Sequence, residues 1–168
     1  LQMMQKARPL MRNAKSELKP KQFLTSRLKL LKVENGIAQN KGEWQVAAKT
    51  LRSIIRYAKE LDDWQTSADA ELRLGMVAIH LKQYEVGERR IKTVKTMAEQ
   101  KGDKKILISA LHHLSVLAWS QGNLEKCEEY AKMGLEKTTP GETTISRAQI
   151  LLSLSAIMAS HGQLNKAT

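Results

Sequence analysis

Cysteine, proline and aromatic residues are scarce in this chain of 168 residues, which has one Cys, three Pro and 4% aromatic residues. A single cysteine excludes a disulfide framework within the chain and argues against a cysteine-based zinc site. No apolar run approaches the length that crosses a bilayer, so we expect no membrane span. Since the lone thiol is typical of a reducing compartment, we expect an intracellular, cytoplasmic protein.

Acidic residues are too few to balance the basic ones, and the imbalance lies in the first third of the chain. The chain has 28 Lys and Arg against 17 Asp and Glu, a net charge of +11. Residues 1–60 carry a net charge of +10, and residues 61–168 carry +1. Such a basic region attracts an anionic partner, for which an acidic protein, nucleic acid and lipid head groups are the alternatives.

The chain repeats itself with a fixed period of forty residues. One position of the repeat is a turn residue, namely Gly42, Lys82, Gly122 and Gly162. Two residues later comes a large side chain, namely Trp44, Tyr84, Leu124 and Leu164. A small residue follows three positions further on, namely Ala47, Gly87, Cys127 and Ala167. Because the chain starts and stops inside a repeat and begins with Leu1 rather than Met, we interpret it as a fragment of a longer protein.

Each repeat has apolar residues at spacings of three and four on both sides of a break, a pattern that predicts a helix–turn–helix. In the third repeat the break is Gln121-Gly122-Asn123, where Gly favours a helix end and Asn caps the next helix. The expected helices are roughly 1–17, 22–40, 43–61, 65–82, 84–101, 104–121, 124–138 and 143–161, with a stub from 163. No segment alternates apolar and polar residues convincingly, so we predict an all-α fold.

These positions resemble the tetratricopeptide repeat. The second repeat matches its pattern at Leu74-Gly75, Ala78, Tyr84, Gly87 and Ile91. The third matches it at Leu111, Leu114-Ser115, Ala118, Gly122, Leu124, Cys127 and Ala131. The first repeat departs from the pattern, with Glu34-Asn35 where Leu-Gly is usual. The resemblance implies a right-handed superhelix of antiparallel helix pairs, an α-solenoid, over the whole of 1–168. Its parts are half a repeat in 1–20, repeats at about 22–62, 63–102 and 103–142, and a truncated repeat at 143–168.

The repeat is longer than the usual tetratricopeptide unit of about 34 residues. Similar long units occur in kinesin light chain, in the Pins and LGN spindle-orientation adaptors, and in sensor domains of some bacterial transcription regulators. Other helical-hairpin repeats are an alternative for the fold, but the constant period with Leu-Gly and Gly-x-aromatic favours the tetratricopeptide type.

The resemblance also implies a binding groove, because the first helices of such repeats line a concave face on which peptides lie. The corresponding positions in this chain are Lys32, Gln39, Asn40, Leu72, Met76, Ile79, His80, His112 and Trp119. These positions form a mainly apolar strip, and we expect Leu72, Met76, Ile79 and Trp119 to be its main anchors. The predicted function is a protein–protein interaction scaffold or adaptor that binds a peptide or helical segment of a partner. Coverage of the strip by the same protein or a second copy is the structural alternative.

The sequence indicates neither catalysis nor a cofactor. His112 and His113 are adjacent on an expected helix, so they point about 100° apart, which is poor geometry for sharing a metal. Cys127 occupies the small-residue position, where a packed, inert thiol is the simpler interpretation. We therefore expect no enzyme activity, no metal site and no cofactor.

Four basic residues of the first repeat lie at spacings of three and four, namely Lys49, Arg52, Arg56 and Lys59. We expect one basic ridge, for which a solvated face is the simplest interpretation and an acidic partner the next. A ridge without interleaved aromatic residues is no platform for stacking bases, so we do not expect nucleic acid there.

Two further functions stay open at this point. The chain is alternatively a sensor or oligomerisation domain of a signalling or transcription regulator, with self-association and a groove filled by its own chain. It is alternatively a scaffold whose basic N-terminal face binds an anionic partner, a nucleic acid or a lipid.

Overall fold

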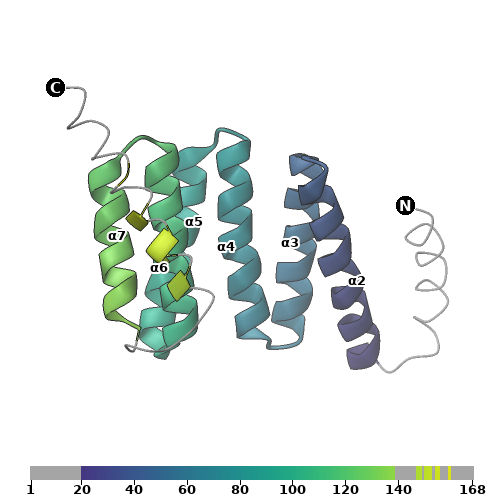
Figure 1. Cartoon of the computed structure of the whole chain (residues 1–168). Helices are drawn as coiled ribbons and strands as arrows, with labels where there is room; N and C mark the ends of the chain where they lie inside the picture. Colours follow the sequence, from purple (N-terminus) through teal and green to yellow (C-terminus); the bar gives the residue numbers. More distant parts are fainter. Residues whose placement is uncertain (1–19, 139–146, 149, 153, 156–158, 160–168) are drawn as a thin grey trace. The chain divides into compact units, whose positions relative to one another are not determined.

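The structure, a computed structural model, describes residues 20–138, 147–148, 150–152, 154–155 and 159 (Figure 1). The chain divides into two compact units, Leu1–Val77 and Ala78–Thr168, each of which is described by itself. The expected helix at 1–17, the half repeat at 1–20 except for Pro20, and the stub from 163 lie outside the described residues.

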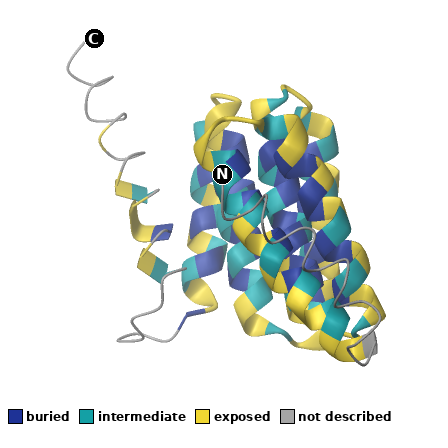
Figure 2. Cartoon of the chain, turned by 90° about the vertical axis from the view of Figure 1, so that its right-hand side faces the viewer, coloured by how far each residue is buried: buried dark blue, intermediate teal, exposed yellow. Residues whose placement is uncertain are grey.

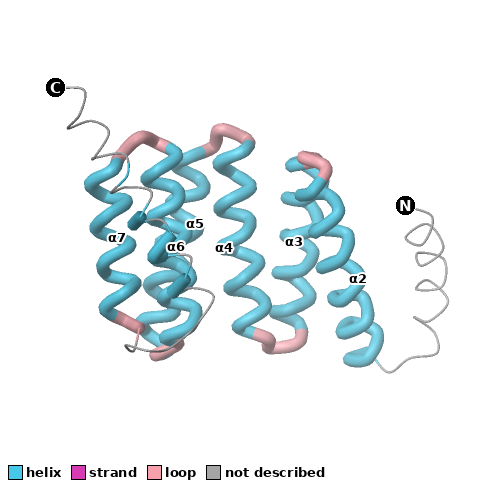
Figure 3. The backbone as a smooth tube through the Cα atoms, in the orientation of Figure 1, coloured by secondary structure: helices cyan, strands magenta, loops and turns pink. Residues whose placement is uncertain are grey.

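Six helices follow one another with short turns between them (Figures 1 and 3). They are α2 (Pro20–Asn40), α3 (Trp44–Glu60), α4 (Trp64–His80), α5 (Tyr84–Lys101), α6 (Lys104–Ser120) and α7 (Leu124–Glu136). The described residues between 147 and 159 are helical too, and no strand occurs in the part of the chain that the structure describes. The predicted all-α fold of antiparallel helix pairs is confirmed, whereas the hand of the superhelix stays a prediction.

The same turn ends five successive helices. A residue with positive φ recurs every twenty residues, with φ of 69° at Gly42, 55° at Asp62, 58° at Lys82, 66° at Gly102 and 74° at Gly122. The N–H of the following residue donates to the carbonyl of an alanine five positions back, at 2.8–2.9 Å, and these acceptors are Ala38, Ala58, Ala78, Ala98 and Ala118. This is the Schellman arrangement, which satisfies helix-end carbonyls. All five alanines are buried, so each turn is anchored at a point where only a methyl group fits.

The helix starts are less uniform than the helix ends. The residues directly before α4, α6 and α7 are N-caps, because a side-chain oxygen of each accepts a backbone N–H of the helix that follows. Asp63 accepts from Thr66 at 3.0 Å, Asp103 from Ile106 at 3.1 Å and Asn123 from Lys126 at 3.0 Å. Glu43 and Gln83 form no such bond, because Asp and Asn have the side-chain length that favours this geometry.

In the first unit, α2 and α3 pack together as a hairpin. The buried side of α3 is apolar except for Thr50 and consists of Ala47, Ala48, Thr50, Leu51, Ile54, Ile55 and Ala58. Asn35 of α2 is 1% exposed, and its Nδ2 donates to the Ala47 carbonyl oxygen at 3.0 Å. Asn35 therefore joins α2 to α3 through this bond. The glycine that is usual at this position of the repeat has no side chain to contact the Ala47 carbonyl.

In the second unit, α6 packs against both α5 and α7. Ile108, Ala131 and Ile150 form a buried cluster, against which Leu135 and Leu154 pack. Buried residues recur along each helix with the helical spacing, as the dark positions in Figure 2 show. Each helix therefore keeps an outward side, on which most of the candidate functional residues lie.

Ser115 and Cys127 occupy the repeat positions of Asn35 and Ala47, eighty residues later. The Ser115 hydroxyl lies 3.2 Å from the Cys127 sulfur, so both hairpins place a polar contact between these two positions. Cys127 is 1% exposed, which confirms that the thiol is packed in the small-residue position.

Candidate functional site

The predicted groove residues divide between the two units. Five of them belong to the first unit, namely Lys32, Gln39, Asn40, Leu72 and Met76. Four belong to the second unit, namely Ile79, His80, His112 and Trp119.

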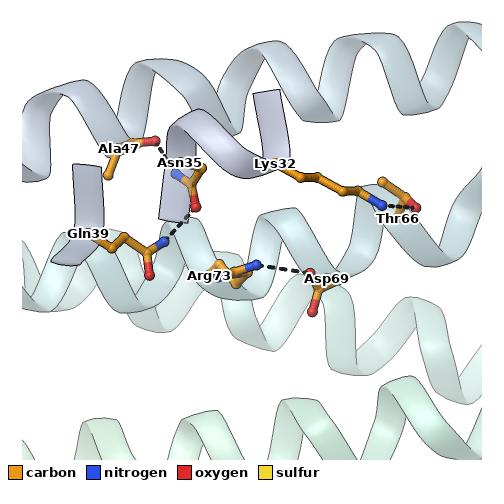
Figure 4. Close-up of polar contacts among 7 residues, drawn as sticks. All are labelled: Lys32, Asn35, Gln39, Ala47, Thr66, Asp69 and Arg73. Carbon is orange, nitrogen blue, oxygen red and sulfur yellow. Dashed lines mark hydrogen bonds and ion pairs between the residues drawn. The ribbon is translucent and has the colours of Figure 1, made fainter. Parts of the chain in front are cut away.

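In the first unit, two of the predicted groove residues are engaged in internal hydrogen bonds (Figure 4). The Lys32 ammonium donates to the Thr66 hydroxyl at 3.2 Å, which ties α2 to the start of α4. The Gln39 amide donates to the Asn35 side-chain oxygen at 2.7 Å, within α2. A partner would have to replace these bonds before using either polar group.

Lys32 lies near a carboxylate as well as a hydroxyl at the start of α4. Bonds from the Thr66 backbone N–H and hydroxyl hold the pKa of Asp63 below its ordinary value, and the nearby Lys32 charge adds to this effect. Lys32 therefore faces an ionised carboxylate as well as a hydroxyl. These two contacts indicate a structural role for Lys32, which holds α2 and the start of α4 together.

Leu72 requires a correction. We expected it among the main anchors of the groove, but it is 0% exposed and belongs to the core of α4. A side chain with no accessible surface cannot contact a partner in this conformation. Met76, one turn further along α4, is half-buried, and Asn40 at the end of α2 is exposed.

In the second unit, one row of α6 side chains keeps accessible surface, although α6 packs against both α5 and α7. His112, Val116 and Trp119 lie there at spacings of four and three, which places them in one row about 10 Å long. We call this row the α6 face. His112 and Val116 are half-buried, whereas Trp119 is 41% exposed. Trp119 is the one exposed Trp, Tyr or Phe in the part of the chain that the structure describes.

The α6 face carries no formal charge near neutral pH. Burial, together with the smaller effect of the neighbouring His113, lowers the pKa of His112 to about 4, so the imidazole is neutral near neutral pH. Its Nδ1 is buried without a hydrogen-bond partner. The His113 Nδ1 instead donates to the Ser109 carbonyl at 2.7 Å. Beyond Lys105, α6 has no Asp, Glu, Lys or Arg, so an uncharged segment suits this surface.

Ile79 and His80, also predicted groove residues, end α4 at the start of the second unit. Ile79 is half-buried and His80 is exposed. Both therefore keep some accessible surface, but the contact of either residue with a partner stays a prediction.

The predicted basic ridge lies on one exposed side of α3. Lys49, Arg52, Arg56 and Lys59 are all exposed, as the spacing predicted. We call these four residues the α3 ridge. The Arg56 guanidinium lies over the Tyr57 ring, with Cζ 4.8 Å from the centroid, a contact that restrains its side chain.

Cys127 is the one thiol of the chain. Burial raises the pKa of the Cys127 thiol, which keeps it protonated near neutral pH and makes it a poor nucleophile. Between residues 20 and 138, and in the described positions beyond, no three His, Cys, Asp or Glu residues gather as a metal site would need. No helix of the described chain is both long and apolar enough to cross a bilayer.

Comparison with known proteins supports the fold. No protein-family model matches the chain, and no curated protein matches it significantly. The chain is similar to the crystal structure of BtubC (BKLC) from P. vanneervenii, with a TM-score of 0.69 and 18% identity. The match covers 98% of this chain and 68% of that one. At this identity the likeness concerns the fold, an all-α arrangement of helical hairpins.

Two contacts were not predicted from the sequence. The first is the bond from Lys32 to Thr66, for which the sequence offers only a weak signal. The spacing Asp63-x-x-Thr66 at a helix start places Thr66 beside a capping carboxylate. Asn35 departs from the repeat pattern, but its bond to the Ala47 carbonyl depends on how closely two helices approach. That distance is not encoded in a local pattern.

Proposed function

We propose that the chain is a non-enzymatic interaction scaffold that binds a peptide or helical segment of another protein. The α6 face is its principal contact surface in the second unit. The observation that carries the proposal is the 41% exposure of Trp119 at the end of an uncharged helix face. Exposing an indole to water is unfavourable, and tryptophan is among the residues most enriched where proteins bind one another.

The neighbouring residues define the kind of segment that would fit. Val116 offers apolar contact beside Trp119, and the neutral His112 offers polarity without charge. A segment with apolar residues at one-turn spacing would cover this row without leaving a buried charge unpaired. The tetratricopeptide resemblance supports the same side of the first helices as a peptide-binding surface.

Selection of peptides from a random library on the full chain tests the proposal. The selected peptides should contain apolar anchors, and Trp119→Ala should weaken their binding about 30-fold, because a tryptophan hot spot contributes about 2 kcal/mol. Met97→Ala is the matched control, since Met97 is 39% exposed on a different helix, and it should change affinity by no more than about twofold. Circular dichroism must show unchanged helix content in both variants.

A spectroscopic readout places the contact directly. In a Trp44→Phe, Trp64→Phe background, Trp119 is the one remaining tryptophan, so a blue shift of its emission on peptide addition reports burial of its indole. Peptides that bind with no shift, and equally well to Trp119→Ala, would contradict the proposal. Self-association would also shift the Trp119 emission to the blue, but without peptide. Sedimentation velocity at several concentrations detects self-association and so separates the two causes of a shift.

A further inference from the structure

The α3 ridge differs from the equivalent surface of the later second helices. Its four positions all carry positive charge on α3. The positions forty residues later, on α5, are Arg89, Lys92, Thr96 and Glu99. Those eighty residues later that fall on α7 are Glu129, Lys132 and Glu136. The same side of the repeat is therefore uniformly basic on α3, mixed on α5 and mainly acidic on α7.

Neutralisation by neighbouring carboxylates also differs between these helices. On α5, Lys92 pairs with Glu88 at 2.7 Å, and on α7, Lys132 pairs with Glu128 at 2.6 Å. Lys49, Arg52 and Lys59 of α3 form no ion pair within the described residues. Glu60, the one acidic residue of α3, is its last residue. The ridge therefore exposes four positive charges over about 15 Å of helix without acidic side chains among them.

We propose that the α3 ridge binds a short acidic segment of a partner protein, rich in Asp and Glu. The charge of the ridge has one sign, and carboxylates at one-turn or two-residue spacing match its single row. Two of the four cations are arginines, whose planar guanidinium groups bind carboxylates through paired hydrogen bonds. This inference concerns residues of the first unit and does not depend on the α6 face.

The structure argues against the other anionic partners. Stable binding of a helix to a lipid surface also needs an apolar side that enters the membrane, but the apolar side of α3 is buried in the hairpin with α2. No exposed aromatic residue occurs among the described residues of the first unit, so these residues offer unpaired bases no fully exposed ring for stacking. A duplex presents phosphates on two strands across a wide face, whereas the four cations of the α3 ridge form a single row along one helix.

The contact is expected to be weak and sensitive to salt. Each exposed ion pair contributes a factor of only a few to an equilibrium constant, and salt screens it. The ridge therefore acts mainly by attracting acidic segments and raising their rate of association.

A charge-matched pair of variants of the full chain tests the inference. The ridge variant carries Lys49→Gln, Arg52→Gln, Arg56→Gln and Lys59→Gln. The control carries Lys41→Gln, Lys105→Gln, Lys126→Gln and Lys137→Gln at exposed positions outside the ridge. Both lower the net charge of +11 by the same four charges. The probe is a fluorescein-labelled peptide in which Glu alternates with Ser, and its neutral counterpart has Gln for Glu.

Fluorescence anisotropy at low salt should show the acidic peptide binding to the wild type and the control within about twofold, but about tenfold more weakly to the ridge variant. The neutral peptide should bind none of them measurably, and Trp119→Ala should leave acidic-peptide binding unchanged. Equal weakening of ridge variant and control would overturn the inference, since net charge alone would then explain the binding. Tighter, ridge-dependent binding of duplex RNA or of phosphatidylserine vesicles would overturn it in favour of those ligands.

Discussion

Asn35 shows how a single polar residue joins two helices without weakening their core. Its amide is 1% exposed, donates to the Ala47 carbonyl and accepts from Gln39, so each of its polar atoms has a partner. A buried amide costs free energy only when it is unpaired, which explains why it replaces the small residue usual at this position. The Asn35–Ala47 bond also fixes the register of α2 on α3.

The first prediction concerns this amide. Asn35→Asp places a carboxylate oxygen against the Ala47 carbonyl in a buried site, and we expect the free energy of unfolding to fall by about 2–4 kcal/mol at neutral pH. Asn35→Ser, which keeps a short donor, should cost only about 1 kcal/mol. Urea denaturation followed by circular dichroism gives both values. Equal losses for the two variants would show that shape rather than the amide donor matters here.

At the scale of the element, the twenty-residue turn sets where each helix stops. Three of the five turn positions with positive φ are glycine, whereas Asp62 and Lys82 adopt the same conformation with a side chain. A residue with a Cβ pays about 1–2 kcal/mol for this conformation. Two of the five helix ends are therefore held in place against local strain by the packed alanine that precedes them.

The turns predict a pair of opposite effects. Lys82→Gly should raise the free energy of unfolding by about 0.5 kcal/mol, because relief of strain exceeds the entropy that glycine adds to the unfolded chain. Gly122→Ala should lower it by about 1–2 kcal/mol, since alanine strains the same conformation. Gln121→Gly is the control, because Gln121 has φ of −93° and gains nothing from glycine. Thermal unfolding by circular dichroism measures all three, and a stabilising Gln121→Gly would contradict this explanation.

Sequence periodicity was sufficient to place the helices, because apolar spacing and turn residues are local signals. The expected helix at 43–61 is α3 at Trp44–Glu60, and the expected helix at 104–121 is α6 at Lys104–Ser120. The exposure of Trp119 and of the α3 ridge followed from the same spacing. Leu72 was misplaced because a repeat position states which side of a helix a residue occupies, but not how closely neighbouring helices cover it. The hydrogen bonds of Lys32 and Asn35 depend on such tertiary distances.

At the scale of the whole molecule, acid should weaken the folded state through two groups. The pKa of His112 is lowered to about 4 from the ordinary 6.5, so between these values the unfolded chain binds more protons than the folded one. Stability is therefore lost as the pH falls from about 6.5 to about 4. The pKa of Asp63 is also lowered, and its contribution, present above the ordinary 3.8, is lost at still lower pH.

The corresponding prediction is a flatter pH profile for His112→Leu. Leucine occupies the equivalent positions 72 and 152, so the substitution suits the helix. The melting temperature of the wild type should decline between pH 6.5 and 4, and that of His112→Leu should decline less over this window and equally below it. His80→Gln, at an exposed position of α4, is the control. An unchanged slope in His112→Leu would assign the decline to other groups.

The regular placement of the turns has a consequence for how such a chain can change in length. Removing or duplicating forty residues preserves the direction in which every later helix runs, so each keeps its own neighbours and its own outward side. Removing twenty reverses every later helix and exchanges first helices with second ones. Insertion or deletion of whole helix pairs, and not of single helices, therefore preserves the surfaces formed by the first and by the second helices.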